Sequence, residues 1–252
     1  MIEVSEVDGT TVVTLANGKV NAMDTELLEG ISNTFNKLAA SDGKGVVLTG
    51  AGKAFCAGVE LKVFAEGGAA YVEKFLPALS DAFEAVFNFP RPVVAAVNGH
   101  AIAGGCILAG ACDRKIMSDS GGRMGVTELY VGLPFPLAAL EVFRYAVGDT
   151  RANDLILTGR TCPAAEALAV GLVDEVVPAD ELMSRALTVA RELAEYIPAD
   201  TYRINKAQLR RDTNDRIARY RAEDDAETLA TWSRPEAGEW AKAFVERVSG
   251  KG

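Results

Sequence analysis

The chain has 252 residues, enough for one large domain or two small ones with a substantial buried core. Hydrophobic residues make up 49% and charged residues 24%, the balance of a globular protein with little room for long disordered segments. The formal net charge of −9 disfavours nonspecific binding to nucleic acid or to an anionic membrane, because the long-range field would repel both. A polyanionic ligand would therefore need a local basic patch.

Targeting and metal-binding signals are absent from the sequence pattern. Residues 1–4 show no cationic segment followed by an apolar run, so no secretory signal is expected and the expected location is cytoplasmic. The apolar segment 93–112 has the length of a membrane span, but Asn98, Gly99 and His100 interrupt it, which favours a strand, a turn and a helix. The four cysteines form no CxxC pair and the chain has one histidine, so we expect reduced, mostly buried thiols and no metal site.

Strand and helix signals alternate through the first two thirds of the chain. Segment 4–15 predicts a hairpin around Asp8-Gly9, and Asp24 is a candidate N-cap for a helix whose apolar residues recur until Gly43. The further predicted elements are a strand at 46–49, a helix at 71–87, a strand at 93–97, a helix at 104–111 and a strand at 115–117. This order predicts stacked strand–helix units of the α/β class.

The last third of the chain predicts helices alone. From about Pro178 the strand signals end, and the segments 181–197 and 201–231 have helical patterns. We therefore divide the chain into a core, residues 1–195, and a helical C-terminal region, residues 196–252. Between Asp200 and Arg221 seven basic residues stand against three acidic ones. This local excess of positive charge fits either a solvated helix face or subunit contact, or a phosphate site.

Two glycine-containing turns each follow a predicted strand. The first, residues 53–61, contains Gly58 among small residues that let a ligand approach the backbone. The second, residues 98–105, leads into a predicted helix, so Gly104 and Gly105 lie at a helix N-terminus, where N–H groups lack intrahelical partners and the dipole favours negative charge. One N–H from each turn would form an oxyanion hole for a thioester oxygen that gains charge as an enolate. Either turn alone is more often a close-packing device, and it is the pair that favours an oxyanion hole.

At these turns the sequence resembles the crotonase family, the enoyl-CoA hydratase/isomerase superfamily, and the resemblance spans nearly the whole chain. The most specific motifs are Lys19-Val20-Asn21-Ala22-Met23, Ala54-Phe55-Cys56-Ala57-Gly58, Asn98-Gly99-His100-Ala101-Ile102-Ala103-Gly104-Gly105-Cys106, Cys112-Asp113, Thr158-Gly159-Arg160 and Gly171-Leu172-Val173-Asp174. The resemblance implies an α/β fold, a crotonase-like spiral of β-β-α turns with a C-terminal helical trimerisation region.

The resemblance also implies an acyl-CoA substrate and the residues that contact it. Ala57 and Gly104 would supply the oxyanion N–H groups. Coenzyme A would be part of the substrate, with no separate cofactor, and a homotrimer or hexamer is expected. The residues implied in substrate and coenzyme A binding are Val20, Ala22, Ala54, Ala57 and Gly58, together with Phe244 and Arg247 as contacts from a neighbouring subunit.

Glu128 is the candidate catalytic base. It stands in the mainly apolar stretch 124–134, where partial desolvation would raise the pKa of its carboxyl group and suit it to remove the proton alpha to a thioester. A glutamate that simply faces water is the alternative. Glu128 also matches the position of a catalytic glutamate in the crotonase family.

Ile107 marks a departure from the hydratase pattern. Hydratases of the family carry a second glutamate after Gly-Gly-Cys, where this chain has isoleucine. Isoleucine cannot position or deprotonate water, whereas moving a double bond needs one carboxylate to take a proton at C2 and return it at C4. The arrangement is similar to that of the mitochondrial type of Δ3,Δ2-enoyl-CoA isomerase. We therefore favour an isomerase, with a hydratase, another crotonase reaction or a noncatalytic acyl-CoA-binding protein as alternatives.

Other candidate residues are interpreted as structural. His100 beside the second turn is expected to pack or to bond to the backbone, and no GxSxG motif presents a serine nucleophile. Cys56 is interpreted as a packing residue, because the sequence places no base beside it. Val59 and Glu60 replace the Ala-Asp usual in the family after Gly58, which leaves the acyl chain length open. No phosphate-binding loop or dinucleotide fingerprint is present in the sequence.

Overall fold

The computed structural model describes residues 1–248, so the last four residues of the predicted C-terminal region lie outside it. Six strands form the larger sheet in the order β1-β2-β3-β5-β7-β10, and four short strands form a second sheet in the order β4-β6-β8-β9. The strands of the first sheet are β1 (Ile2–Val7), β2 (Thr10–Leu15), β3 (Val46–Gly50), β5 (Val93–Val97), β7 (Arg114–Ser118) and β10 (Glu175–Val177). Those of the second are β4 (Ala54–Cys56), β6 (His100–Ile102), β8 (Arg123–Gly125) and β9 (Thr161–Pro163).

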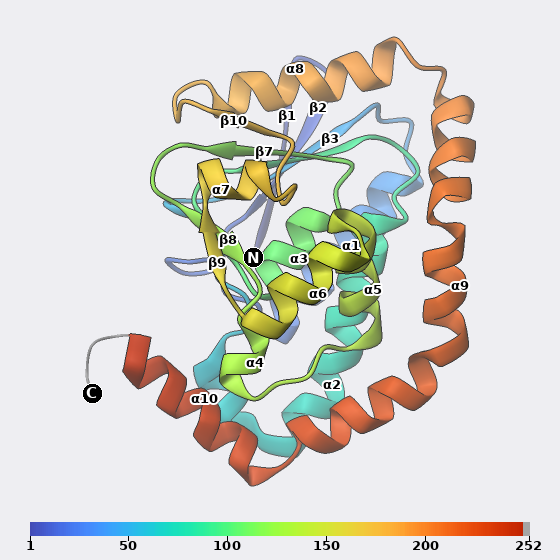
Figure 1. Cartoon of the computed structure of the whole chain (residues 1–252). Coiled ribbons are helices and arrows are strands. Elements are labelled where there is room, and N and C mark those ends of the chain that lie inside the picture. The colour runs from blue at the N-terminus through green and yellow to red at the C-terminus, as the bar shows by residue number, and fades with distance from the viewer. Residues whose placement is uncertain (249–252) are drawn as a thin grey trace.

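The larger sheet lies between two helical layers (Figure 1). The antiparallel pair β1–β2 confirms the predicted hairpin, and the pairs from β2 to β10 are parallel. On one face the strands pack against α1 (Thr25–Ala39), α2 (Leu61–Phe87) and α3 (Gly104–Gly110). On the other face they pack against α8 (Leu182–Glu195), with apolar side chains such as Val47, Val94 and Ala186 between sheet and helix. This arrangement is the predicted α/β class.

Two helices show how the local sequence sets their bounds. The Asp24 carboxylate accepts a hydrogen bond from the Leu27 N–H at 2.8 Å, so Asp24 is the N-cap of α1 as predicted. Helix α2 begins ten residues before the predicted start at Tyr71. It is broken by Gly68, whose φ of 56° and ψ of −156° are not helical. The apolar periodicity stops at the adjacent glycines, which is why the segment before them was missed.

Short helices connect the later strands. They are α4 (Glu128–Val131), α5 (Leu137–Val147), α6 (Asp149–Thr158) and α7 (Ala164–Ala169). After α8 the chain contains α9 (Ala199–Trp232) and α10 (Pro235–Val248). Figure 1 shows α9 curving around the outside of the molecule and α10 returning beneath α4 and α2, against which it packs. The described part of the C-terminal region is thus helical, as predicted.

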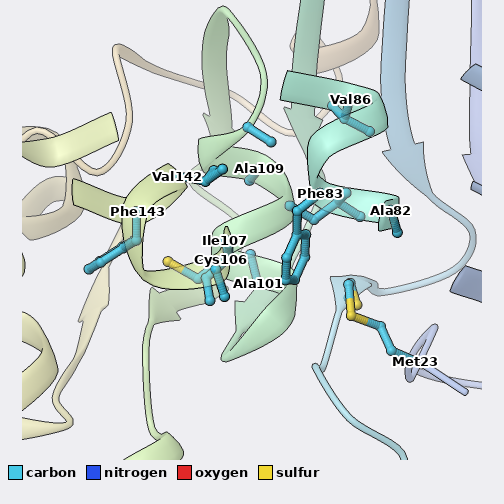
Figure 2. Packing of buried hydrophobic residues seen from close by; sticks show 14 of the residues in the cluster. Met23, Ala82, Phe83, Val86, Ala101, Cys106, Ile107, Ala109, Val142 and Phe143 are labelled. Atoms are coloured by element: carbon cyan, nitrogen blue, oxygen red, sulfur yellow. The ribbon is translucent and has the colours of Figure 1, made fainter. Parts of the chain in front are cut away.

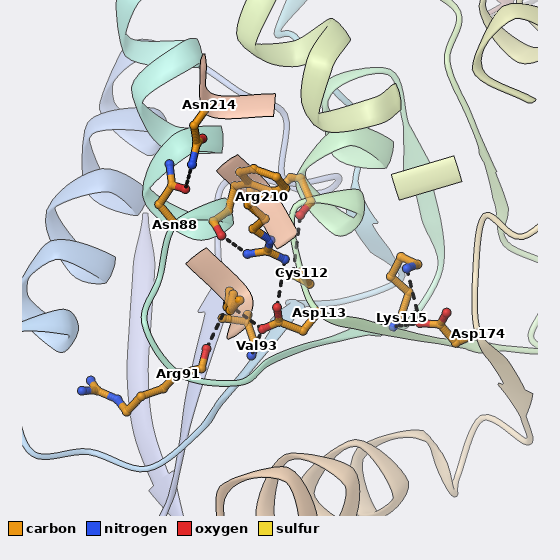
Figure 3. A network of polar contacts seen from close by, with 12 residues as sticks. Asn88, Arg91, Val93, Cys112, Asp113, Lys115, Asp174, Arg210 and Asn214 are labelled. Carbon is orange, nitrogen blue, oxygen red and sulfur yellow. Dashed lines mark hydrogen bonds and ion pairs between the residues drawn. The ribbon is translucent and has the colours of Figure 1, made fainter. Parts of the chain in front are cut away.

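Buried ion pairs hold α9 against the core (Figure 3). The Asp113 carboxylate, just before β7, binds Lys206 Nζ at 2.7 Å and Arg210 Nη2 at 2.8 Å. Both cations are buried, and Arg210 also donates to the Phe87 carbonyl at the end of α2. Further along α9, Arg216 and Arg221 pair with carboxylates of α5 and α2. Basic residues of α9 therefore form ion pairs with carboxylates of their own chain, which favours a role in holding α9 in place over a phosphate site.

Two further findings concern the described residues 1–248. No helix among them is long and apolar enough to cross a membrane. All four cysteines are free and buried, as predicted.

Candidate active site

The first turn of the site is fixed by Asn21. This buried residue has a positive φ of 52°, and its Nδ2 donates to the carbonyls of Ala51 and Ala54 at 3.0 and 2.9 Å. Asn21 thereby ties the segment containing Val20 and Ala22 to strand β4. The structure thus brings together the predicted coenzyme A contacts Val20, Ala22, Ala54, Ala57 and Gly58 in two adjacent backbone segments.

The N–H of Ala57 is not free. It donates to the Val20 carbonyl at 3.0 Å, which contradicts the expectation that Ala57 supplies an N–H to a substrate oxygen. Two residues later the chain forms a parallel bridge in which the Gly58 carbonyl and the Glu60 N–H both bond to Met23. In such a bridge the intervening residue points its own N–H away from the partner strand. Val59 is therefore the residue of this turn whose N–H faces outward.

The second turn presents the N–H of Gly104. Ala103 has a positive φ of 53°, and its N–H donates to the Gly125 carbonyl, which leaves Gly104 as the first residue of α3. An added Cβ on Gly58 would lie 3.3 Å from the Gly104 nitrogen, so the two turns are in contact. Among residues 1–248 the N–H groups of Val59 and Gly104 have no hydrogen-bond partner. The structure thus places two unpaired N–H donors, one from each turn, close together.

The segment that leads to Glu128 runs next to the second turn, because strand β8 pairs with β6, and the Glu128 carboxylate is close enough to the Cys106 thiol of α3 to raise the pKa of that thiol. Ile102 in β6 pairs with Gly125 in β8. Gly104 follows Ile102 by two residues and Glu128 follows Gly125 by three, so both residues come directly after neighbouring strands. Glu128 is the first residue of α4, and its Oε2 atom is inaccessible to solvent and has no hydrogen-bond partner among the described residues. The residue as a whole is only partly buried, so it is the carboxyl end that is shielded.

Burial raises the pKa of the Glu128 carboxyl group to about 7, although nearby backbone N–H groups of Glu128 and Thr127 act to lower it. Among the described residues no lysine, arginine or histidine forms an ion pair with it. A carboxyl group with this pKa exchanges its proton near neutral pH, as a general base in a nonpolar site must.

Apolar side chains surround the start of α3 (Figure 2). Ile107 is fully buried in the main core, and Figure 2 shows the Phe83 ring between α3 and Met23. A Cβ added to Gly104 would meet the Met23 sulfur at 2.9 Å and the Phe83 ring at 3.6 Å. No second carboxylate stands at position 107.

Phe244 and Arg247 lie against their own chain. Gly132, at the end of α4, is in close contact with the Trp240 ring of α10, and the Arg247 guanidinium lies 5.9 Å from the centre of the Tyr130 ring. Phe244 and Arg247 line a cavity of about 440 Å³ with residues 129–132. Helix α10 folds back over α4 of the same chain, so both residues lie near the segment that follows Glu128, and their predicted contact with a neighbouring subunit stays a prediction.

His100 and Cys56 have the structural roles expected of them. His100 is exposed, and its Nδ1 accepts a hydrogen bond from the Arg123 N–H at 3.3 Å. Burial raises the pKa of the Cys56 thiol to about 12, so this sulfur is protonated at neutral pH and is a poor nucleophile. Within residues 1–248 no cluster of three or more His, Cys, Asp or Glu side chains could hold a metal ion.

Unpaired N–H donors can stabilise a developing oxyanion, and a shielded carboxyl group on a neighbouring strand end can exchange a proton near neutral pH. The family described as enoyl-CoA hydratase/isomerase matches residues 6–251. The chain therefore belongs to the enoyl-CoA hydratase/isomerase family, the crotonase family, as the sequence motifs predicted.

Some relatives of the chain are named hydratases and others are named isomerases. A Thermus thermophilus protein named as an enoyl-CoA hydratase is 40% identical over 182 residues, 71% of each chain. The rat mitochondrial enoyl-CoA delta isomerase 1 is 28% identical over 246 residues, 96% of this chain and 85% of its own. The crystal structure of human mitochondrial Δ3-Δ2-enoyl-CoA isomerase superposes with a TM-score of 0.92 at 27% identity, covering 99% of this chain and 98% of that one.

The Gly104→Val variant tests the second donor. Its Cβ would meet the end of the flexible Met23 side chain, so the variant should fold, but crowding against Met23 and Phe83 should displace the Gly104 N–H from a bound thioester oxygen. Turnover of enoyl-CoA should fall by about a hundred- to a thousandfold, as in other oxyanion holes that lose one donor. Gly105→Val is the control for loss of activity through misfolding, because its side chain would overlap the Cys56 carbonyl and should prevent the native fold. A folded Gly104→Val protein with nearly normal turnover would contradict the assignment.

The Glu128→Gln variant should be more stable than the wild type at alkaline pH. The carboxyl pKa rises from 4.5 to about 7 on folding, so the folded state resists ionisation and the free energy of unfolding falls between these pH values. Glutamine removes this loss, which corresponds to roughly 3 kcal/mol at full ionisation. Urea denaturation at about pH 8 and about pH 5 should show a larger gain at the higher pH.

The matched control is Glu141→Gln. Glu141 is also buried, but Arg144 and Arg216 both bind it at 2.6 Å, so removing its charge should destabilise the protein at about pH 8. An equal effect of Glu128→Gln at both pH values would show that the Glu128 carboxyl has an ordinary pKa.

Proposed function

We propose that the chain catalyses migration of a double bond from C3 to C2 in enoyl-CoA thioesters. The observation that carries this proposal is the shielded, unpartnered carboxyl group of Glu128, on the strand end beside the turn that presents the Gly104 N–H, together with an isoleucine at position 107. The similarity to the human and rat isomerases along nearly the whole chain supports it.

In the proposed reaction the thioester oxygen accepts hydrogen bonds from the N–H groups of Val59 and Gly104. The Glu128 carboxylate removes a proton from C2, and the electron pair of that C–H bond moves into a dienolate whose negative charge rests on the thioester oxygen. The two donors stabilise this charge in a site shielded from water. Glu128 then returns the same proton to C4, which leaves the double bond between C2 and C3 and the base ionised again.

Hydration is the second candidate, and the Thermus thermophilus relative favours it. Adding water across the 2,3 double bond calls for acid and base groups on both sides of that water. In this chain the position of the second hydratase glutamate is Ile107, which is 1% exposed and packed in the core. We therefore place isomerisation ahead of hydration, and of a noncatalytic role, which the shielded Glu128 carboxyl argues against.

Coenzyme A binding is proposed along the backbone of the first turn. Val20 is exposed and Ala57 is partly exposed, while Ala22, Ala54 and Gly58 carry nothing larger than a methyl group that would obstruct an extended ligand. Coenzyme A belongs to the substrate in this scheme, and no further cofactor takes part.

We also propose that the chain assembles as a homotrimer or a hexamer. Helix α9 exposes the large apolar side chains Ile204, Leu209 and Tyr220, and Leu209 is 70% exposed. Large apolar side chains gathered along one long helix are typical of surfaces that become buried in an assembly.

Glu128→Gln should abolish isomerisation while leaving acyl-CoA binding intact. The amide keeps the shape of the side chain but cannot accept the C2 proton, so turnover should fall by at least about 10²–10⁴-fold. In the wild type, kcat/KM should rise with pH through about 7, because the base acts in its ionised form. The measurements are the absorbance of the conjugated thioester formed from 3-enoyl-CoA and, separately, 3-hydroxyacyl-CoA formed from 2-enoyl-CoA.

Variants at position 107 separate the two reactions. Ile107→Glu adds a second carboxylate and should introduce hydration, whereas Ile107→Gln, of similar size and without charge, should not. Since a buried new charge can destabilise the helix, each variant is first checked for a native circular dichroism spectrum. The single-base mechanism fails if the wild type hydrates 2-enoyl-CoA faster than it isomerises 3-enoyl-CoA, or if Glu128→Gln still isomerises.

Sedimentation tests the assembly. At micromolar concentration the wild type should sediment with three or six times the mass of one chain. Leu209→Glu places a charge in the exposed apolar face and should shift the protein toward smaller species. A wild type that sediments as a monomer would refute the proposed trimer or hexamer.

A further inference from the structure

An aromatic contact links the start of α2, which follows Val59, to the loop that follows Glu128 and α4. The Trp232 ring, at the end of α9, meets the Phe64 ring edge to face, with ring centres 5.7 Å apart and an angle of 88° between the planes. The Trp232 Nε1–H donates to the Pro134 carbonyl at 2.9 Å. Both rings are almost fully buried, so their positions are fixed by packing as well as by this hydrogen bond.

Each partner of this contact belongs to an element that carries a reacting group. Phe64 lies in the first turn of α2, where its N–H donates to the Glu60 carbonyl, directly after the donor Val59. Pro134 follows α4, and the adjacent Leu133 N–H donates to the Glu128 carbonyl at 3.1 Å. Trp232 therefore bridges the start of the helix behind the donor and the loop behind the base.

Further aromatic rings of α2 continue the contact that Trp232 makes with Phe64. Phe75 lies 6.2 Å from Trp232 between ring centres, and Tyr71 stacks on Phe75 at 5.3 Å. Helix α10 covers the outside, with Gly238 against Ala65 of α2. On the opposite side, Met23 and Phe83 back the Gly104 donor inside the core.

We propose that Phe64 and Trp232 form the end wall of the acyl-binding cavity and restrict the enzyme to short acyl groups, an inference that rests on the proposed function. The thioester carbon is held at Val59 and Gly104, and C2 to C4 must reach Glu128. Carbons beyond C4 then continue between the start of α2 and the loop after α4, where the Phe64–Trp232 contact closes the space. A longer chain has to displace two packed rings, and it loses their mutual contact and the hydrogen bond to Pro134.

Binding of saturated acyl-CoA measures the length of the cavity without catalysis. The probes are acetyl-, butyryl-, hexanoyl-, octanoyl- and decanoyl-CoA, each titrated into the full chain by calorimetry. Each methylene buried in an apolar cavity increases affinity about fourfold. In the wild type the affinity should rise along the series and stop rising no later than hexanoyl-CoA. In Phe64→Ala and Trp232→Ala the rise should continue to at least one longer member.

Two controls separate a wall from a general packing effect. Phe35→Ala removes another buried edge-to-face pair, formed with Phe89 at 5.4 Å between α1 and the end of α2. It should lower stability without moving the length limit. Trp232→Phe keeps an aromatic ring but loses the bond to Pro134, and it should keep a limit close to that of the wild type.

The outcomes distinguish this inference from the proposed reaction. If the wild type binds decanoyl-CoA more tightly than hexanoyl-CoA, or if both alanine variants fold and keep the wild-type limit, the wall assignment is overturned. If the limit moves as expected but 3-enoyl-CoA of matching length is not isomerised, the reaction is wrong and the wall stands. Should one alanine variant fail to fold, Phe64→Leu and Trp232→Leu repeat the test with smaller cavities.

Discussion

The site depends on direct contact between the backbones of successive turns. A side chain on Gly105 would overlap the Cys56 carbonyl, and one on Gly99 would overlap the Lys53 carbonyl, so the turn 98–105 lies on the turn 53–58 with no side chain between them. This contact brings the N–H groups of Val59 and Gly104 together, although the two residues are far apart in the sequence. Donors fixed in this way need no reorganisation when charge develops on a bound oxygen.

Glu128 differs from other shielded carboxyl groups of the chain in its ion pairing. Glu141 is buried and Asp113 is partly buried, and each is bound by two cations of the chain. Glu128 is the buried carboxyl group that has no cation bound to it among the described residues, and burial raises its pKa accordingly. The fold thus neutralises the carboxylates that hold helices in place and leaves unneutralised the one that must exchange a proton. A local loss of stability of this kind is typical of functional sites.

The elements predicted from sequence are those whose formation is decided locally. Periodic apolar residues and the Asp24 cap identified α1, and the turn at Asp8-Gly9 identified the hairpin. The strands β4, β6, β8 and β9 were missed, because each has three residues and exists only by pairing with the others. Glu128 and Gly104 were found by their motifs. Val59 was missed, since which N–H of its turn remains free is decided by pairing with Met23, a distant residue that the motif does not reveal.

Helix α10 packs near the site within its own chain. The resemblance implied that Phe244 and Arg247 reach a neighbouring subunit, whereas here α10 packs on α2 and α4 of its own chain. Trp232 is the last residue of α9, just before the chain turns back into α10, and it contacts Pro134 and Phe64 there. The donors, the base and the aromatic wall all come from one chain. The proposed limit on acyl length therefore needs no residue beyond those of one protomer.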